Sequence, residues 1–168
     1  MLIRNIALLL AAASAGVPAA SAGVPAASAQ SGNAQTQIDA IVQSINGGDL
    51  GVVEILGVPP ATLFRVNVTP KCLDSLWDYK LAVRGRCLES EKLRMALSSA
   101  TIQPLNTKLD SLDVPTAIVF YSKTAEGQRV ASLYFNRNGR HGAVNNIPSS
   151  FDPDFFPRLK RALHPCVE

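Results

Sequence analysis

The first 29 residues constrain the fold most, because they decide which part of the chain folds and in which compartment. Arg4 gives a positive start, residues 6–13 form an apolar run, and residues 27–29 form an Ala-Ser-Ala cleavage site. This order of charge, apolar core and small-residue site predicts a cleavable secretory signal peptide over residues 1–29. We therefore expect an exported protein in which residues 30–168 form a single globular domain in the periplasm or the extracellular space.

The leader also contains a repeat, since ASAGVPA occupies residues 13–19 and again 20–26. A short unit of Ala, Gly and Pro cannot bury a core, so we interpret the repeat as a duplication within the leader. It creates further A-x-A sites after Ala15 and Ala22, and the cleavage position stays open, with Gln30 favoured as the first mature residue. An uncleaved anchor is the alternative, but a membrane-spanning helix needs about 20 apolar residues and two prolines interrupt this stretch. We expect no transmembrane segment after cleavage.

Removing residues 1–29 from the 168-residue chain leaves 139 residues, and loss of Arg4 lowers the formal net charge from +3 to +2. A domain of this size buries about two thirds of its unfolded surface, so it needs no metal or cofactor to fold, and we expect neither. The small net charge gives no strong indication of a nucleic-acid partner. The disulfide candidates are Cys72, Cys87 and Cys166. In an oxidising compartment one bridge is expected, which leaves the third thiol free or intermolecular.

Apolar periodicity predicts helices along the chain. The first covers residues 38–45 and ends at Gly47, a second short helix covers residues 50–56 with Asp49 as its N-cap, and Ser90 caps a third helix. Asp154 begins a last helix whose expected buried face is Phe155, Phe156, Leu159 and Leu163.

Other segments alternate as strands do. Strands are expected over residues 63–68, 116–121, 130–135 and 141–147, with a loop over residues 103–114. The last three strands follow one another through short turns and so form a meander. We therefore predict an α+β fold in which a small antiparallel β-meander of about three to four strands is flanked by several short helices.

Residues 70–84 fit two structures. Thr69 and Pro70 are typical of a helix start, and the apolar spacing that follows favours a helix up to Gly85. Residues 77–84 also alternate between apolar and polar side chains, as a half-buried strand does. We favour the helix. A continuous helix would separate Cys72 from Cys87 by about 20 Å, whereas a disulfide needs Cα atoms within about 7 Å, so the helix predicts that Cys166 bonds one of them.

The densest polar cluster lies near the third strand of the meander. Its members are Arg137, Asn138, Arg140, His141 and Asn145. Guanidinium groups match carboxylates and phosphates, so this hairpin is the candidate binding surface, although an Asn- and Gly-rich turn with exposed basic side chains has the same composition. Trp77 is expected in the core, and an exposed Trp77 would indicate a contact site for a protein or carbohydrate.

No family resemblance is specific enough to name, and no motif of a known catalytic class occurs. We therefore expect a non-catalytic binding, inhibitor or envelope-accessory module whose partner is another envelope or extracellular protein. The alternative is a small secreted hydrolase in which His141 acts as general base and Arg137 and Arg140 stabilise an anionic intermediate.

Overall fold

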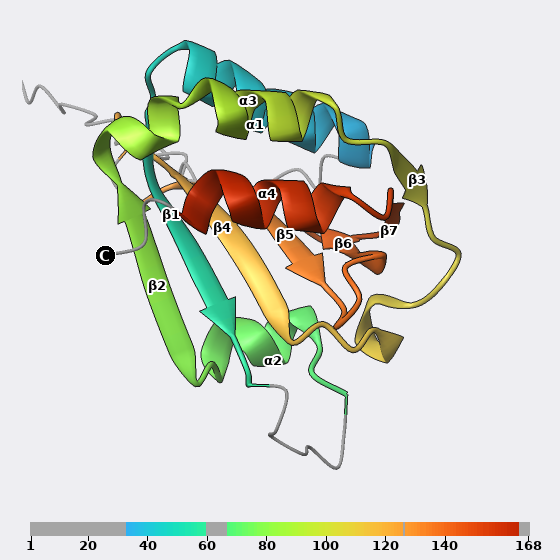
Figure 1. Cartoon of the computed structure of the whole chain (residues 1–168). Helices are drawn as coiled ribbons and strands as arrows, with labels where there is room; N and C mark the ends of the chain where they lie inside the picture. The colour runs from blue at the N-terminus through green and yellow to red at the C-terminus, as the bar shows by residue number, and fades with distance from the viewer. Residues whose placement is uncertain (1–32, 60–66, 126, 165–168) are drawn as a thin grey trace, which may run out of the picture. The chain divides into compact units, whose positions relative to one another are not determined.

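Within the residues that the structure describes, seven strands form one antiparallel sheet in the order β2-β1-β4-β5-β6-β7-β3 (Figure 1). The structure is a computed structural model and describes residues 33–59, 67–125 and 127–164, which all belong to one compact unit of the chain. The α+β class is confirmed, but the expected meander of three to four strands is wrong, because three further strands join it. The strands are β1 (Leu50–Gly57), β2 (Tyr79–Arg84), β3 (Ile102–Pro104), β4 (Thr116–Ser122), β5 (Arg129–Phe135), β6 (His141–Val144) and β7 (Ile147–Phe151).

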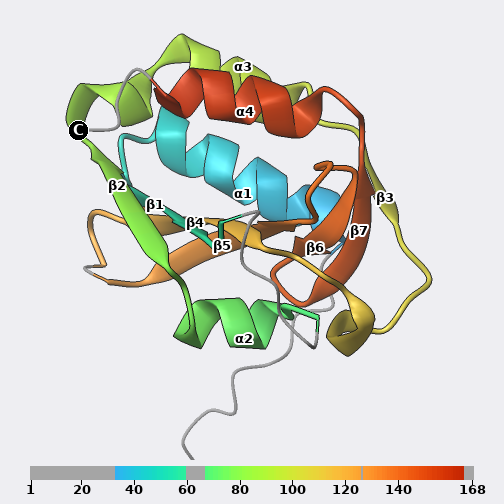
Figure 2. The ribbon, with the colours of Figure 1, turned by 60° about the horizontal axis from the view of Figure 1, so that its bottom comes forward.

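In the described ranges, four α-helices pack on the two faces of this sheet. Figure 2 shows α1, α3 and α4 on one face, called here the helix side, and the short α2 on the other, called the α2 side. Their bounds are α1 (Ala34–Asn46), α2 (Pro70–Ser75), α3 (Glu91–Ser98) and α4 (Phe155–Leu163). Ser90 caps α3 as predicted, its side chain accepting from the Leu93 N–H at 3.2 Å. Ile38, Ile41 and Ile45 of α1 are buried, and Val42 is partly buried. The predicted buried face of α4 is confirmed, except that Phe156 is only partly buried.

The helix expected over residues 50–56 is instead the strand β1. This strand lies between β2 and β4 and is covered on both faces, with Val53 in the helix-side core and Leu56 in the α2-side core. A strand buried on both faces has no polar alternation, and its apolar run is easily taken for a short helix. Asp49 caps no helix. Its carboxylate accepts hydrogen bonds from the Thr124 N–H at 2.9 Å and from the Ser122 hydroxyl at 3.1 Å.

The two structures considered for residues 70–84 are each correct for half of the segment. The helix α2 starts as predicted, with Pro70 in its first turn and the Thr69 hydroxyl accepting from the Cys72 N–H. It ends at Ser75, and the strand β2 then pairs with β1 from Tyr79 to Arg84. The predicted continuous helix is therefore wrong, because the backbone N–H and C=O groups of residues 79–84 form hydrogen bonds with β1 in place of bonds within a helix.

The strand expected over residues 141–147 is two strands, β6 and β7. Val144 pairs with Ile147, and Asn145 between them has a positive φ of 52°, a conformation that asparagine tolerates better than most residues. The segment expected as a loop over residues 103–114 contributes β3, which pairs with the outer edge of β7. The strand expected over residues 63–68 lies mostly outside the described residues, as does the whole leader.

Cys72 and Cys87 lie on different sides of the sheet. Cys72 is in α2 and has a free thiol, whereas Cys87 packs against the helix-side core. This placement excludes a bond between these two residues without refolding, because a disulfide tolerates a Cα separation of only about 7 Å. Cys166 lies outside the described residues, so the expected bond of Cys166 to one of the other two cysteines stays a prediction, and the free thiol of Cys72 favours Cys87 as its partner.

Candidate functional site

The structure brings together only part of the predicted hairpin cluster. Arg137, Asn138 and His141 line a hollow of about 470 Å³ together with Ser111 and Asp113 of the connection between β3 and β4. Arg140 is exposed but does not line this hollow. The hollow therefore contains Arg137 without Arg140.

Polar side chains around this hollow already form hydrogen bonds with backbone groups. The Asn138 side-chain oxygen accepts from the Arg140 N–H at 3.0 Å, and Asp113 accepts from the Val68 N–H at 3.1 Å. Asn145 lies at the opposite end of β6, where it accepts from the Ser132 N–H at 2.7 Å and donates to the Gln37 side chain at 2.9 Å. Asn145 thus connects α1 to the sheet and is a structural residue.

The hydrolase hypothesis requires a base that is oriented by a second group. Within the described part of the chain, the His141 imidazole has no hydrogen bond to a carboxylate or hydroxyl group, and the backbone N–H of His141 donates to the Asn136 side chain at 3.2 Å. The described residues also contain no group of three or more His, Cys, Asp and Glu side chains that could hold a metal ion. Nothing in this geometry favours catalysis at His141.

A second polar region lies on the α2 side of the sheet and was not among the predicted sites. The register aligns Arg84 of β2, Val52 of β1, Tyr121 of β4 and Arg129 of β5 in one row across four strands. Arg129 reaches this side because the pairing of β4 with β5 shifts by one residue after Phe120, a β-bulge that reverses the side to which a strand residue points. Without the bulge, strand alternation would direct Arg129 to the helix side.

Arg129 and Tyr134 connect this row to α2 through Asp74. The Tyr134 hydroxyl donates to the Asp74 carboxylate at 2.9 Å, and the Arg129 guanidinium donates to it at 3.0 Å. Burial, followed by the negative charge of Asp74, raises the pKa of Tyr134 to about 12. Tyr134 is therefore a protonated donor at neutral pH and positions α2 on the sheet.

Tyr121 forms a similar contact further along the row. Its hydroxyl donates to Glu54 at 3.0 Å, and Lys80 pairs with the same carboxylate at 2.6 Å. Burial, followed by the hydrogen bond to Glu54, raises the pKa of Tyr121. Both tyrosines thus stay neutral at physiological pH, and neither is suited to act as a base.

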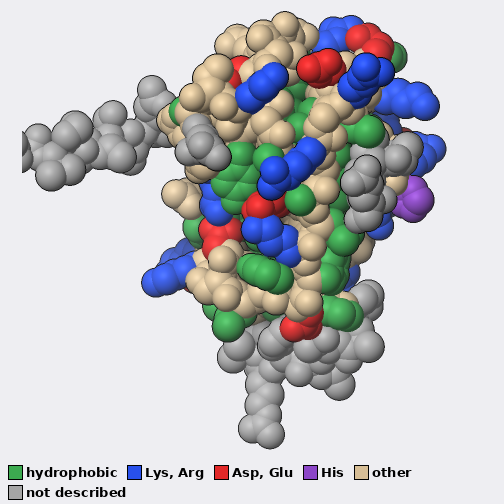
Figure 3. All heavy atoms as spheres, turned by 90° about the vertical axis from the view of Figure 1, so that its left-hand side faces the viewer, with side chains coloured by type: hydrophobic (Ala, Val, Ile, Leu, Met, Phe, Trp, Pro, Cys, Tyr) green, Lys and Arg blue, Asp and Glu red, His purple; other side chains and the backbone are tan. Residues whose placement is uncertain are grey.

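Beside Tyr121 the surface forms a concavity of about 450 Å³, called here the basic hollow. Its charged side chains are Lys80, Arg84, Lys123 and Glu54. Lys80 is neutralised by Glu54, whereas Arg84 and Lys123 have no carboxylate within 4 Å among the described residues. Figure 3 faces the β2 side of the molecule and shows basic side chains interspersed with acidic and apolar ones. The hollow therefore offers two unneutralised cations to a ligand.

Apolar side chains are exposed next to this hollow, between α2 and β2. Trp77 is 43% exposed and Leu76 is 69% exposed, so the expected core position of Trp77 is wrong. The Lys80 ammonium lies 5.8 Å from the centre of the Trp77 ring and also lines the hollow. Trp77 and the basic hollow thus form one continuous surface, called here the Trp77 surface.

The sequence contained part of the signal for this surface. Lys80 and Arg84 are two of the polar positions in the alternating segment 77–84, and an exposed Trp77 was the stated indication of a contact site. Nothing in the sequence indicated Lys123 or Arg129, because a turn places Lys123 beside the hollow and a β-bulge directs Arg129 to the α2 side.

No family model matches the chain, and neither a curated protein nor a solved structure matches it. Among the described residues, no helix combines the length and the hydropathy needed to cross a bilayer.

Proposed function

We propose that this chain is an exported, non-catalytic binding protein and that its Trp77 surface binds an acidic segment of another envelope or extracellular protein. The observation that carries the proposal is the half-exposed Trp77 next to the two unneutralised cations of the basic hollow. Tryptophan and arginine are the residues that contribute most often to binding free energy at protein interfaces. A large exposed aromatic side chain with adjacent charges is typical of such an interface.

The charge of the hollow determines the kind of partner. Glu54 is already paired with Lys80, so the remaining charge comes from Arg84 and Lys123 on two different elements. Arg84 is fixed on β2, and Lys123 lies in the β4–β5 turn that Asp49 holds by hydrogen bonds. Two cations whose backbone positions are fixed favour a partner with carboxylates at a matching separation, because little backbone freedom is lost on binding.

Export is tested first. The full chain is expressed with its leader in a bacterial host, and the protein recovered from the periplasm or medium is examined by N-terminal sequencing and intact mass. We expect a mature protein that starts at Gln30. A protein retained in the cytoplasm at full length would contradict the exported part of the proposal.

Binding is tested with that mature protein. A fluorescent peptide rich in Glu, with a Lys-rich peptide of equal length as control, is titrated at two salt concentrations, and an envelope extract is then passed over the immobilised protein. We expect Trp77→Ala combined with Arg84→Ala to weaken peptide binding by about tenfold or more and to release the captured partner. Arg140→Ala is the matched control, since it removes an exposed arginine outside the hollow. Equal effects of both variants, or preference for the Lys-rich peptide, would refute the site.

A further inference from the structure

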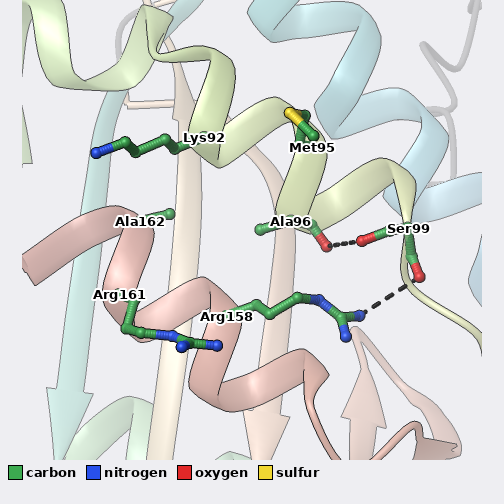
Figure 4. A pocket seen from close by; sticks show the side chains of 7 residues that line it. All are labelled: Lys92, Met95, Ala96, Ser99, Arg158, Arg161 and Ala162. Carbon is green, nitrogen blue, oxygen red and sulfur yellow. Dashed lines mark hydrogen bonds between the residues drawn. The ribbon is translucent and has the colours of Figure 1, made fainter.

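A groove lies between α3 and α4 on the outer surface of the helix layer, and its volume is about 390 Å³ (Figure 4). Its floor and one wall are apolar, formed by the small side chains of Ala96 and Ala162 and by Met95. Met95 is 59% exposed, so the groove is open to solvent along this wall. The residues that line it are Lys92, Met95, Ala96, Ser99, Arg158, Arg161 and Ala162.

The rims of the groove are basic on both sides. Lys92 projects from α3 and Arg161 from α4, and neither has a carboxylate within 4 Å among the described residues (Figure 4). Arg158 is already engaged, because it donates to Asp152 at 3.1 Å and to the Ser99 carbonyl at 3.4 Å. Among the residues that the structure describes, no acidic side chain lines the groove. An apolar floor between two unneutralised cations is complementary to a ligand with an apolar centre and negative charge on both flanks.

The dimensions of the groove favour a helix as that ligand. The helices α3 and α4 have eight and nine residues and are therefore about 12 and 13.5 Å long at 1.5 Å per residue, so a third helix lying along them could contact them over about two turns. A lipid tail would stay largely in water here because the groove is open. The outer face of an amphipathic helix tolerates water, and an exposed methionine adapts to different apolar side chains.

We propose that the groove between α3 and α4 docks an amphipathic helix of a partner protein, with its apolar stripe on Met95, Ala96 and Ala162 and acidic side chains facing Lys92 and Arg161. This mode of recognition uses apolar anchors spaced i, i+3, i+4 and i+7 on the bound helix. The groove lies on the helix side of the sheet, whereas the Trp77 surface lies on the α2 side. The second docking site is therefore independent of the proposed function, and both sites can be occupied in one molecule.

The probe is a fluorescent amphipathic peptide of about 15 residues, the length at which an isolated helix becomes stable. It has leucines at i, i+3, i+4 and i+7 and glutamates on both flanks. One control peptide has the same composition in scrambled order, and another has lysine in place of each glutamate. Binding to the mature exported protein is measured by fluorescence anisotropy, and circular dichroism reports helix formation in the peptide. We expect saturable binding of the Glu peptide alone.

Variants on the surface of α3 and α4 locate the site. Arg161→Glu and Met95→Asp are each expected to weaken binding of the Glu peptide by about tenfold or more. Lys160→Glu is the matched control, because it makes the same charge change on the same helix while its ammonium lies over the Phe156 ring, outside the groove. Arg161→Glu should also bind the Lys peptide better than the unaltered protein does. The titrations are repeated in the Trp77→Ala/Arg84→Ala variant, which lacks the other proposed site for an acidic peptide. The loss caused by Arg161→Glu should persist there, which separates its outcome from that of the proposed function.

Three results would overturn the proposal. The first is equal binding of the scrambled and amphipathic peptides, and the second is equal weakening by Lys160→Glu and Arg161→Glu. The third is a different occupant. A dimer in sedimentation that Met95→Asp dissociates would assign the groove to a second copy of the chain. Binding to phosphatidylglycerol vesicles without binding to the Glu peptide would assign it to a membrane surface.

Discussion

Tyr134→Phe tests whether the contact with Asp74 fixes α2 on the sheet. The Tyr134 side chain is buried and its hydroxyl donates to both carboxylate oxygens of Asp74, at 2.9 and 3.0 Å. Phenylalanine keeps the ring and so creates no cavity larger than the missing oxygen. A hydrogen bond to a charged group contributes about 1.5–3 kcal/mol, and Asp74 keeps its bond to Arg129 and part of its hydration, so we expect the lower end, about 1.5 kcal/mol.

The assay is equilibrium unfolding of the mature protein in urea. With a denaturant dependence of about 2 kcal/mol per molar, a loss of about 1.5 kcal/mol lowers the midpoint by about 0.75 M and leaves the slope unchanged. Tyr79→Phe is the control, because Tyr79 is partly exposed at the start of β2 and its hydroxyl has no hydrogen bond to a described residue. Equal midpoints for Tyr134→Phe and Tyr79→Phe would refute the structural role of the contact.

The pH dependence gives a second check on Tyr134. Its folded pKa is about 12 and its ordinary value is 10.0, so between these values the unfolded chain loses a proton that the folded chain keeps. Stability is therefore fully present below about pH 10 and declines as the pH rises toward 12. Tyr134→Phe should remove part of this alkaline decline. Tyr121, whose pKa is also raised, accounts for the remainder.

Three further predictions follow from other parts of the fold. Gly142→Ala should destabilise the protein by about 3 kcal/mol or more in urea unfolding, because an added Cβ would overlap the Tyr134 carbonyl oxygen, whereas Gly47→Ala should be tolerated. The Thr124 hydroxyl holds the pKa of Asp49 below its ordinary value of 3.8. The ionised carboxylate therefore stabilises the fold above that pH, and this stability is lost as the pH falls through the folded pKa. In Asp49→Asn the decline of stability on acidification, measured by urea unfolding, should be smaller. Peptide mapping of the oxidised protein should show Cys87 bonded to Cys166 and Cys72 alkylated, and a bond between Cys72 and Cys87 would contradict the placement of α2.

Elements specified by local signals were predicted well from the sequence. The helix α3 has its Ser90 cap and an apolar stripe within one short segment, and β4 and β5 are joined by a short turn. In these cases neighbouring residues determine the structure, so one sequence is sufficient. The strands β1 and β3 were missed because their structure depends on distant pairing partners, which local periodicity does not report.

The same distinction separates the candidate sites. The hairpin cluster was predicted because its residues are adjacent in sequence, yet only Arg137, Asn138 and His141 of the cluster line one hollow. The basic hollow brings Arg84 of β2 next to Lys123 of the β4–β5 turn, and the groove brings Lys92 of α3 next to Arg161 of α4. Such pairs become visible only when the sheet order and the helix packing are known.

The charged side chains fall into two groups, the carboxylates that are paired within the fold and the cations that are exposed and available to a ligand. Asp74, Glu54 and Asp49 each have their charge satisfied by donors from other elements. A partly buried carboxylate without a hydrogen-bond partner would destabilise the fold, so the contacts of these three carboxylates are explained by their contribution to stability. Arg84, Lys123, Lys92 and Arg161 have no such partners among the described residues, and they flank exposed Trp77 or Met95. Exposed lysine and arginine side chains are solvated by water and need no carboxylate partner. The proposed recognition at these two regions therefore rests on their position beside the exposed side chains of Trp77 and Met95.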